Sequence, residues 1–271
     1  MPLITISQKL GSGGKKIAQL VAKGLNSDLY DDARLQKEAI DSGVRTEDLK
    51  HLNEKMPNLF DRILGTNPDV YIDVMESVVY EVSKRGEGVI IGHCSQMLLR
   101  DFSCALHVRI NASDGKRIDT LMQEKNLTRK NAEKLIRKSD SQLNGFFKYA
   151  FHMDLGDPSL YDVILNTEKL SNEAVAKIII DLATSDEINT CSLNALEAME
   201  KLAQKKKVEA ELLRNDISLR LLNVDVPKKG SLLLSGVSNS ESEVDRILEI
   251  IQAIPEIADV ESSIVIANET F

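Results

Sequence analysis

A glycine-rich stretch near the start of the chain combines residues that can bind phosphate. It reads Gly11-Ser12-Gly13-Gly14-Lys15 and follows the apolar run of residues 3–6. Glycines allow positive φ angles and let backbone N–H groups approach an anion, while the N-terminus of a following helix carries partial positive charge. A lysine in this place can reach the outer phosphates of a nucleotide. The order of strand, glycine loop and helix therefore predicts a phosphate-binding site.

The loop departs from the usual P-loop pattern at two positions. That pattern has a glycine five residues before Gly14 and a serine or threonine after the lysine, whereas this chain has Lys9 and Lys16 there. A bound magnesium ion would lose its usual hydroxyl ligand. A glycine-rich turn in an ordinary α/β domain is the alternative interpretation of the same residues.

Short apolar strands alternate with amphipathic helices after the loop. Residues 88–91 form a strand of the buried type, and residues 106–110 alternate apolar and polar side chains as a strand does. Alternating strands and helices predict a mostly parallel sheet, with ligands at the carboxyl ends of its strands. The glycine loop, the Gly92-His93 turn and Asp31 are expected at that edge.

These motifs resemble the cytidylate-kinase-like family, whose members are P-loop nucleoside monophosphate kinases. The first strand and loop of that family usually read Ile-Ser-Arg-x-Phe-Gly-Ser-Gly-Gly, and residues 6–14 read Ile-Ser-Gln-Lys-Leu-Gly-Ser-Gly-Gly. Further similar segments follow in the family's order at residues 30–31, 59–65, 89–92 and 156–167. The resemblance implies a P-loop kinase-like three-layer α/β sandwich over residues 1–184.

The resemblance also implies how phosphate would be bound and transferred. Gly11, Ser12, Gly13, Gly14 and Lys15 would hold the phosphates of ATP, which would bind with Mg2+. Lys15, Arg117 and Arg137 are the candidate catalytic cations, the last two as parts of a mobile lid. A solvated helix face is the alternative interpretation of the basic residues within 128–148. No metal-binding cluster of protein side chains is expected.

Three further residues are candidates for substrate binding, and the family suggests CMP or dCMP as the substrate. Asp31 and Asn166 follow strands and would face the nucleoside, and Lys138 belongs to the lid region. Helix capping or a turn is the alternative role for Asp31, and a turn is the alternative for Asn166.

Four positions where the family usually carries arginine hold other residues here, namely Gln8, His93, Thr120 and Leu143. Phosphoryl transfer depends on cations that stabilise the transferring group, so a lost arginine can cost several orders of magnitude in rate. Either neighbouring basic residues or a different substrate compensates, or catalysis is lost. Two hypotheses follow: an active nucleoside monophosphate kinase, and a catalytically degenerate pseudokinase that senses a nucleotide and signals through the C-terminal region.

A second pattern, helix, strand, strand, helix and strand, begins at residue 208. It resembles a BON domain, whose Gly-x-Val-x-Leu-x-Gly signature is met by Gly230, Leu232, Leu234 and Gly236. Ser240 and Glu243 form a capping box at the start of the second helix. We expect a partly helical linker at residues 185–207 and a small, independently folding α/β BON-like domain at residues 208–267. Its expected partner is a protein or small ligand more than a lipid.

Composition limits the class of protein. The chain has 271 residues, 42% of them hydrophobic, and a formal net charge of −8. An acidic chain is a poor general binder of nucleic acid or anionic membranes. The N-terminus leads directly into a strand without a signal sequence, and no apolar run is long enough to span a bilayer. We therefore expect a cytoplasmic protein with no nucleic-acid partner and no transmembrane segment.

Overall fold

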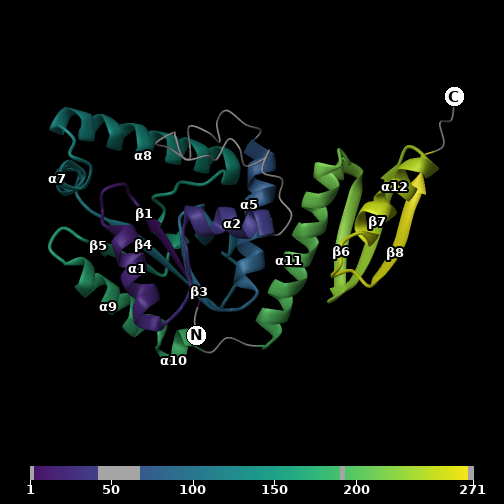
Figure 1. The fold of residues 1–271 in the computed structure, drawn as a ribbon, viewed down its shortest axis with the longest axis horizontal. Helices are drawn as coiled ribbons and strands as arrows, with labels where there is room; N and C mark the ends of the chain where they lie inside the picture. Colours follow the sequence, from purple (N-terminus) through teal and green to yellow (C-terminus); the bar gives the residue numbers. More distant parts are fainter. Residues whose placement is uncertain (1–2, 42–67, 190–192, 268–271) are drawn as a thin grey trace. The chain divides into compact units, whose positions relative to one another are not determined.

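The computed structural model describes residues 3–41, 68–189 and 193–267, and Figure 1 shows their fold. Two compact units are formed, the first by Met1–Ile72 with Arg85–Ala195 and the second by Asp73–Lys84 with Leu196–Phe271. The similar segment at residues 59–65 lies outside the described residues. The units are considered one at a time.

The first unit contains a five-stranded sheet in which every strand pair is parallel. Its strands are β1 (Leu3–Gln8), β2 (Leu29–Tyr30), β3 (Gly88–Ile91), β4 (Ala105–Asn111) and β5 (Val163–Asn166). They lie in the order β2-β3-β1-β4-β5, so β1 is central and its neighbours are β3 and β4. The predicted parallel α/β sheet is confirmed.

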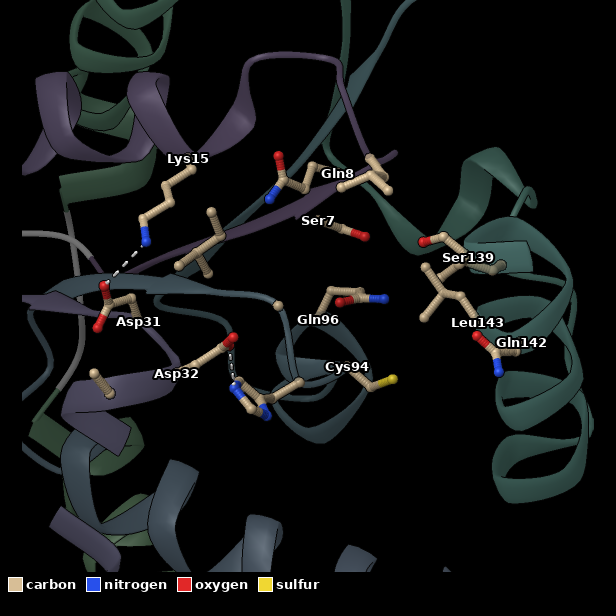
Figure 2. A pocket seen from close by; sticks show the side chains of 16 residues that line it. Ser7, Gln8, Lys15, Asp31, Asp32, Cys94, Gln96, Ser139, Gln142 and Leu143 are labelled. Atoms are coloured by element: carbon tan, nitrogen blue, oxygen red, sulfur yellow. Dashed lines mark hydrogen bonds and ion pairs between the residues drawn. The ribbon is translucent and has the colours of Figure 1, made fainter. Parts of the chain in front are cut away.

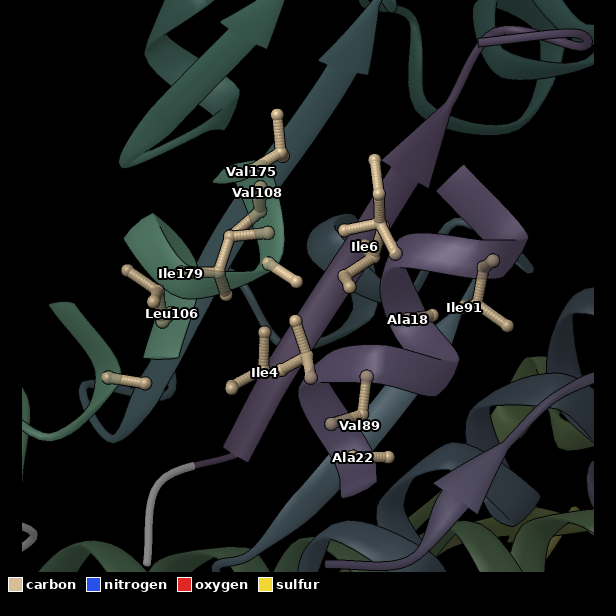
Figure 3. Packing of buried hydrophobic residues seen from close by; sticks show 14 of the residues in the cluster. Ile4, Ile6, Ala18, Ala22, Val89, Ile91, Leu106, Val108, Val175 and Ile179 are labelled. Atoms are coloured by element: carbon tan, nitrogen blue, oxygen red, sulfur yellow. The ribbon is translucent and has the colours of Figure 1, made fainter. Parts of the chain in front are cut away.

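One face of this sheet carries the main hydrophobic core of the unit, shown in Figure 3. Ile4, Ile6 and Val108 are completely buried there against α1 (Gly14–Leu25) and α9 (Asn172–Ala183). Each such side chain contributes roughly 1.5–3 kcal/mol of transfer free energy. This packing fixes α1, and therefore the glycine loop before it, against the end of β1.

The opposite face is covered by further helices, which complete the three-layer sandwich. Phe146 and Phe147 of α8 (Arg129–Phe151) are buried with Leu155, Leu160 and Tyr161. Among the described residues, the other α-helices that begin in this unit are α2 (Asp32–Asp41), α5 (Pro68–Ser83), α6 (Ser95–Leu98), α7 (Asp114–Lys125), α10 (Asp186–Asn189) and α11 (Leu193–Arg214), and the residues of α5 and α11 are divided between the two units. Phe146 and Phe147 of α8 thus form part of the core, whereas Tyr149 on the same helix is 53% exposed.

The second unit contains a three-stranded sheet, in which β6 (Leu222–Lys228) pairs antiparallel with β7 (Ser231–Ser238) and β7 pairs parallel with β8 (Asp259–Ile266). Its core joins Val208 and Leu212 of α11 to the sheet and to α12 (Glu241–Gln252). The predicted order of elements is confirmed. Because α11 continues across residue 207, no break in secondary structure separates the expected linker from the expected domain. The bounds of the linker, 185–207, and of the BON-like domain, 208–267, stay predictions.

Within the parts of the chain that the structure describes, no helix combines the length and apolar character needed to cross a membrane.

Candidate functional site

The glycine loop between β1 and α1 is held in place by contacts from distant parts of the chain. Ser12 Oγ donates a hydrogen bond to the Lys9 carbonyl oxygen at 2.7 Å, and Thr167 Oγ1 donates to the Ser12 carbonyl oxygen at 3.0 Å. From α7, Arg117 Nε donates to the Leu10 carbonyl oxygen at 2.8 Å. The loop conformation is therefore supported by side chains from α7 and from the segment after β5.

Two of the loop's glycines are required by this shape. Gly11 and Gly13 have φ angles of 84° and 83°, which side-chain-bearing residues rarely adopt. A Cβ atom at Gly13 would also lie 2.5 Å from Asn172 Oδ1. Replacing either glycine would disturb the fold as well as any bound phosphate.

The N-terminus of α1 is open to an anion. Gly13 is its N-cap and supplies no side-chain hydrogen bond, and the first turn contains no acidic residue. Lys15 and Lys16 lie there instead, and both are exposed. Cations at the positive end of a helix dipole are unfavourable, and a bound phosphate would offset that repulsion.

A pocket of about 330 Å3 opens beside the loop, at the carboxyl edge of the sheet. Its lining comes from β1 and the loop after it, the first turn of α1, the start of α2, the end of β3 and the turn after it, α6, α8 and the segment after α8. Figure 2 shows Ser139, Gln142 and Leu143 of α8 on one side and Lys15, Asp31 and Asp32 on the other. Lys15 belongs both to the loop and to this pocket.

Two pairs of polar side chains lie in the pocket lining. Lys15 Nζ lies 3.9 Å from Asp31 Oδ2, and His93 Nε2 lies 2.8 Å from Asp32 Oδ1 (Figure 2). The His93 side chain is only 4% exposed. Asp31 also caps α2, because its Oδ1 accepts a hydrogen bond from Arg34 N at 3.1 Å. The substrate-facing and capping interpretations of Asp31 are thus compatible.

Three of the four positions that differ from the family pattern meet in this pocket. Gln8, His93 and Leu143 all line it. Gln8 lies directly against the start of α1, since a Cβ atom at Gly14 would be 2.5 Å from Gln8 Oε1. Thr120 lies elsewhere on α7 and donates to the Lys116 carbonyl oxygen at 2.9 Å. Three of the four differences therefore change the lining of one pocket.

The predicted catalytic residue Arg117 has the contacts of a structural ion pair. Its side chain is fully buried, and its Nη1 and Nη2 donate to the two carboxylate oxygens of Asp140 at 2.8 and 2.7 Å. Asp114 accepts a further hydrogen bond from Nη1 at 3.0 Å. A catalytic role for Arg117 stays a prediction, but this guanidinium has no exposed surface to offer a phosphate.

The other predicted lid and substrate residues lie outside the pocket lining. Arg137 and Lys138 are exposed on α8, and the residues of α8 that line the pocket are Ser139, Gln142 and Leu143. Asn166 is exposed at the end of β5, where its Oδ1 accepts a hydrogen bond from Glu168 N at 2.9 Å. This hydrogen bond is consistent with a turn, which was the alternative interpretation of Asn166.

A buried arginine beneath the pocket was not singled out by the sequence. Arg109 of β4 is 5% exposed, donates to Ser7 Oγ and lies 5.6 Å from the centre of the Tyr161 ring. Burial lowers the pKa of Arg109, and the neighbouring Tyr161 and Asp140 oppose that shift. The alternation within residues 106–110 was the available signal, because it places Arg109 on the face opposite Val108.

The turn after β3 that carries His93 has an unusual backbone. Gly92, His93 and Cys94 have successive φ angles of 80°, 54° and 55°. Such conformations are uncommon in residues with side chains and cluster at functional sites. Burial raises the pKa of the Cys94 thiol to about 12, so this pocket-lining cysteine stays protonated near neutral pH.

Across residues 3–41, 68–189 and 193–267, no three histidine, cysteine or carboxylate side chains gather in a way that would hold a metal ion. The position after Lys15 holds Lys16, and the Ser12 hydroxyl already donates to the Lys9 carbonyl oxygen.

Comparison with known proteins finds a matching family model and relatives of low sequence identity. The family model described as "Cytidylate kinase-like family" matches residues 3–169. A cytidylate kinase of Sulfurisphaera tokodaii is 26% identical over 179 residues, which cover 65% of this chain and 92% of that protein. A cytidylate kinase of Staphylothermus marinus is 27% identical over 182 residues, covering 66% and 94%.

Solved structures with low sequence identity share the fold of the first unit, and we describe one of them. It is an uncharacterized protein from Eubacterium ventriosum, with a TM-score of 0.54 and 18% identity, covering 68% of this chain and 99% of that chain.

Proposed function

Because the chain belongs to the cytidylate kinase-like family, we propose that its first unit binds ATP at residues 11–15 and transfers the terminal phosphoryl group to an acceptor in the pocket. The observation that carries this proposal is the position of Lys15. It lies in the first turn of α1, where a phosphate would bind, and it also lines the pocket beside the loop. A donor phosphate and an acceptor would therefore meet at one cation.

The protein's contribution to the reaction would be mainly positioning and electrostatic stabilisation. Backbone N–H groups at the start of α1 would hold the phosphate oxygens, and Lys15 would stabilise charge on the transferring group. Mg2+ bound to ATP would neutralise further phosphate charge. Asp32, whose side chain is 75% exposed beside the pocket, would supply a carboxylate toward that ion's water shell.

The acceptor that the relatives suggest is a nucleoside monophosphate. The similar curated proteins are named cytidylate kinases, so CMP and dCMP are the first acceptors to test. The pocket volume of about 330 Å3 falls at the lower end of typical small-molecule sites.

A nucleotide sensor without catalysis is the second candidate function. It is favoured by the pocket environment of Gln8 and Leu143, two neutral residues where the family pattern has arginine. The complete burial of Arg117 adds to this, because its guanidinium is already bonded to Asp140. In this function ATP would bind at the loop without being consumed.

Binding of ATP is tested with a matched pair of lysine variants. Calorimetric titration with ATP and Mg2+ should show at least tenfold weaker binding for Lys15→Met, about 1.4 kcal/mol. Lys23→Met is the control, because Lys23 is exposed in the last turn of α1, away from the loop, and does not line the pocket. Equal affinities for wild type and both variants would contradict the assigned role of Lys15, and no binding by wild type would overturn the proposal.

Catalysis is tested by following phosphate transfer from labelled ATP to a panel of phosphorylated and unphosphorylated nucleosides. Turnover of roughly 1–1000 per second with any acceptor would establish the kinase. Binding of ATP without transfer to any acceptor would establish the sensor. Gln8→Arg with Leu143→Arg serves as a gain-of-function comparison for CMP.

For the second unit we propose a BON-like interaction module. Its support is the element order and Gly236, whose φ angle of 140° and close approach to the Leu221 carbonyl oxygen explain the signature glycine. The proposed partner is a protein or small ligand. The full chain should show no binding to anionic vesicles in a flotation assay, and strong flotation would reverse the preference against lipid.

A further inference from the structure

The small sheet of the second unit has two edges of different character. β7 lies between β6 and β8, so among the described residues β6 and β8 each pair with a strand on one side only (Figure 1). An open edge presents backbone N–H and C=O groups that can bond to a further strand. The residues along each edge decide whether a strand can be added there.

The β6 edge is interrupted. Pro227 lies within β6 and has no backbone N–H to donate. The register between β6 and β7 also shifts between Asp225 and Lys228, so that only Leu222–Asp225 pair regularly. Proline and bulges are common ways in which natural sheets prevent edge pairing. A strand approaching β6 would therefore find a short and broken row of hydrogen-bonding groups.

The β8 edge is continuous. β8 keeps a single register with β7 along its whole length, Asp259–Ile266, and contains no proline. Its only charged residues are Asp259 and Glu261, both in the first half of the strand, and residues 262–266 are uncharged. Uncharged strand segments without proline, rich in β-branched residues, are the ones that pair with other chains when they lie at an edge.

The direction of the β8 backbone groups follows from the hydrogen bonds at its two ends. Asp259 N donates to the Gly230 carbonyl oxygen at 3.1 Å, and Ala267 N donates to the Ser238 carbonyl oxygen at 2.9 Å. Because successive residues of a strand point their backbone groups to opposite sides, the odd-numbered residues between them also face β7. The N–H groups that face the open edge belong to the even-numbered residues Val260, Ser262, Ile264 and Ile266.

An exposed apolar pair lies beside this edge. Val265 of β8 is 64% exposed, and Val237, its register partner on β7, is 38% exposed. Leu232 and Leu234 of β7 are buried on the other face of the sheet, in the core with α11 and α12. Strand addition at β8 would cover part of Val265, because side chains of adjacent strands contact each other on the same face.

We propose that this edge is occupied by a second copy of the chain, with the two β8 strands antiparallel and the two three-stranded sheets joined into one. The charge pattern of the strand supports this arrangement. In an antiparallel pair the acidic first half of each β8 lies opposite the uncharged second half of the other. A parallel pair in the same register would instead place Glu261 opposite Glu261, and like charges directly opposite are destabilising.

The interrupted β6 edge also limits how far the assembly can grow. Pairing of β8 with β6 of the next copy would continue from chain to chain, but Pro227 and the register shift oppose it. Pairing of β8 with β8 uses the same surface on both copies and closes at two. A dimer is therefore the expected product, and a fibre is not.

Two properties of this dimer follow from its size and charge. A single added strand pair is a small interface, so association should be weak and dependent on concentration. Each chain carries a formal net charge of −8, and the resulting repulsion is screened by salt. Dimerisation should therefore strengthen as the salt concentration rises.

The first test is sedimentation velocity of the full chain at about 1 to 300 µM, a range suited to weak interfaces, at low and high salt. We expect monomer at the lower end and dimer at the upper end, with more dimer at high salt. Monomer throughout would mean that the edge serves a different chain or none, and it would overturn the proposal.

Variants locate the interface. Ser262→Pro removes an N–H that faces the open edge and leaves the hydrogen bonds to β7 intact, so it should weaken dimerisation at least tenfold. Ser262→Thr keeps that N–H at the same exposed position and is the matched control. Val237→Lys changes the open face on the middle strand and should alter the dimerisation constant less than threefold. A dimer unaffected by Ser262→Pro, or one abolished by Val237→Lys, would contradict pairing through the β8 edge.

Amide hydrogen exchange of the wild-type chain, measured by NMR, gives an answer that does not depend on how a variant folds. The N–H groups of Ser262 and Ile264 should exchange more slowly at high than at low protein concentration, because only the dimer bonds them. The N–H of Ser263 faces β7 and should exchange at the same rate at both concentrations. Exchange at Ser262 and Ile264 that does not depend on concentration would exclude the proposed interface.

Discussion

The ion pair between Arg117 and Asp140 offers a quantitative test of how the phosphate loop is supported. The Arg117 side chain has no exposed surface, and both terminal nitrogens donate to the Asp140 carboxylate. Asp140→Ala would leave this guanidinium buried and largely unpaired. Since Arg117 Nε also donates to the Leu10 carbonyl oxygen, the first unit and its loop would be destabilised together.

The expected cost follows from the burial of the pair. Removing one partner of a buried ion pair costs about 3–5 kcal/mol. Asp140 is 31% exposed, so water replaces part of the carboxylate, and Asp114 still accepts from Nη1 at 3.0 Å. We therefore expect the lower end of the range, about 3 kcal/mol. For a unit of this size that corresponds to a fall in Tm of about 6–12 °C.

The assay is urea and thermal unfolding followed by circular dichroism at 222 nm, since the chain has no tryptophan. Asp114→Ala is the matched control and should cost less than about 1 kcal/mol, because Asp114 is 79% exposed. The double variant Arg117→Met with Asp140→Leu should recover most of the loss, since apolar residues often replace a buried pair at little cost. A change below about 0.5 kcal/mol in Asp140→Ala, or a double variant no more stable than it, would refute this reasoning.

Three further changes test other parts of the fold. Burial lowers the pKa of His107 below its ordinary value of 6.5, so at lower pH the unfolded chain binds a proton more readily than the folded protein does, and the free energy of unfolding falls on acidification. Wild type should therefore lose more Tm than His107→Gln between pH 7.5 and 5.5. Parallel curves of Tm against pH for the two proteins would contradict this. Gly236→Ala should strongly destabilise the second unit, because a Cβ would lie 2.0 Å from the Leu221 carbonyl oxygen, whereas Gly145→Ala in open space within α8 should be neutral or stabilise by about 1 kcal/mol in the same urea titration. Gln204→Ala should cost about 1–3 kcal/mol, because Gln204 Oε1 accepts from Gly230 N at 3.0 Å, and a loss below about 0.5 kcal/mol would show that water replaces it.

Local features of the fold could be predicted from the sequence because neighbouring residues determine them. The glycine loop needs the positive φ angles of Gly11 and Gly13, and the strand at residues 88–91 has the bounds that its apolar run predicted. Ser240 caps α12 through Glu243 N at 3.2 Å, as the capping box indicated. Each of these depends on φ preference, hydrophobic pattern or a hydrogen bond over three residues.

The sequence also identified part of the candidate site. Lys15 and Asp31 were expected at the carboxyl edge of the sheet, and both line the pocket. The topology of alternating strands and helices brings strand ends to one edge, so residues that directly follow a strand are predictable. Gln8 and His93, noted as departures from the family pattern, lie in the same lining for the same reason.

Only the tertiary structure decided which polar residues face the pocket and which are buried in ion pairs. Arg117 and Arg137 look alike in the sequence, yet one is fully buried against Asp140 and the other is exposed on α8. Likewise, Arg109 donates a hydrogen bond to Ser7, 102 positions away in the sequence, and Gln142 lines the pocket only because of how α8 packs. These outcomes depend on the rotation and docking of whole elements, where the burial of apolar side chains far outweighs the preference of any one polar residue.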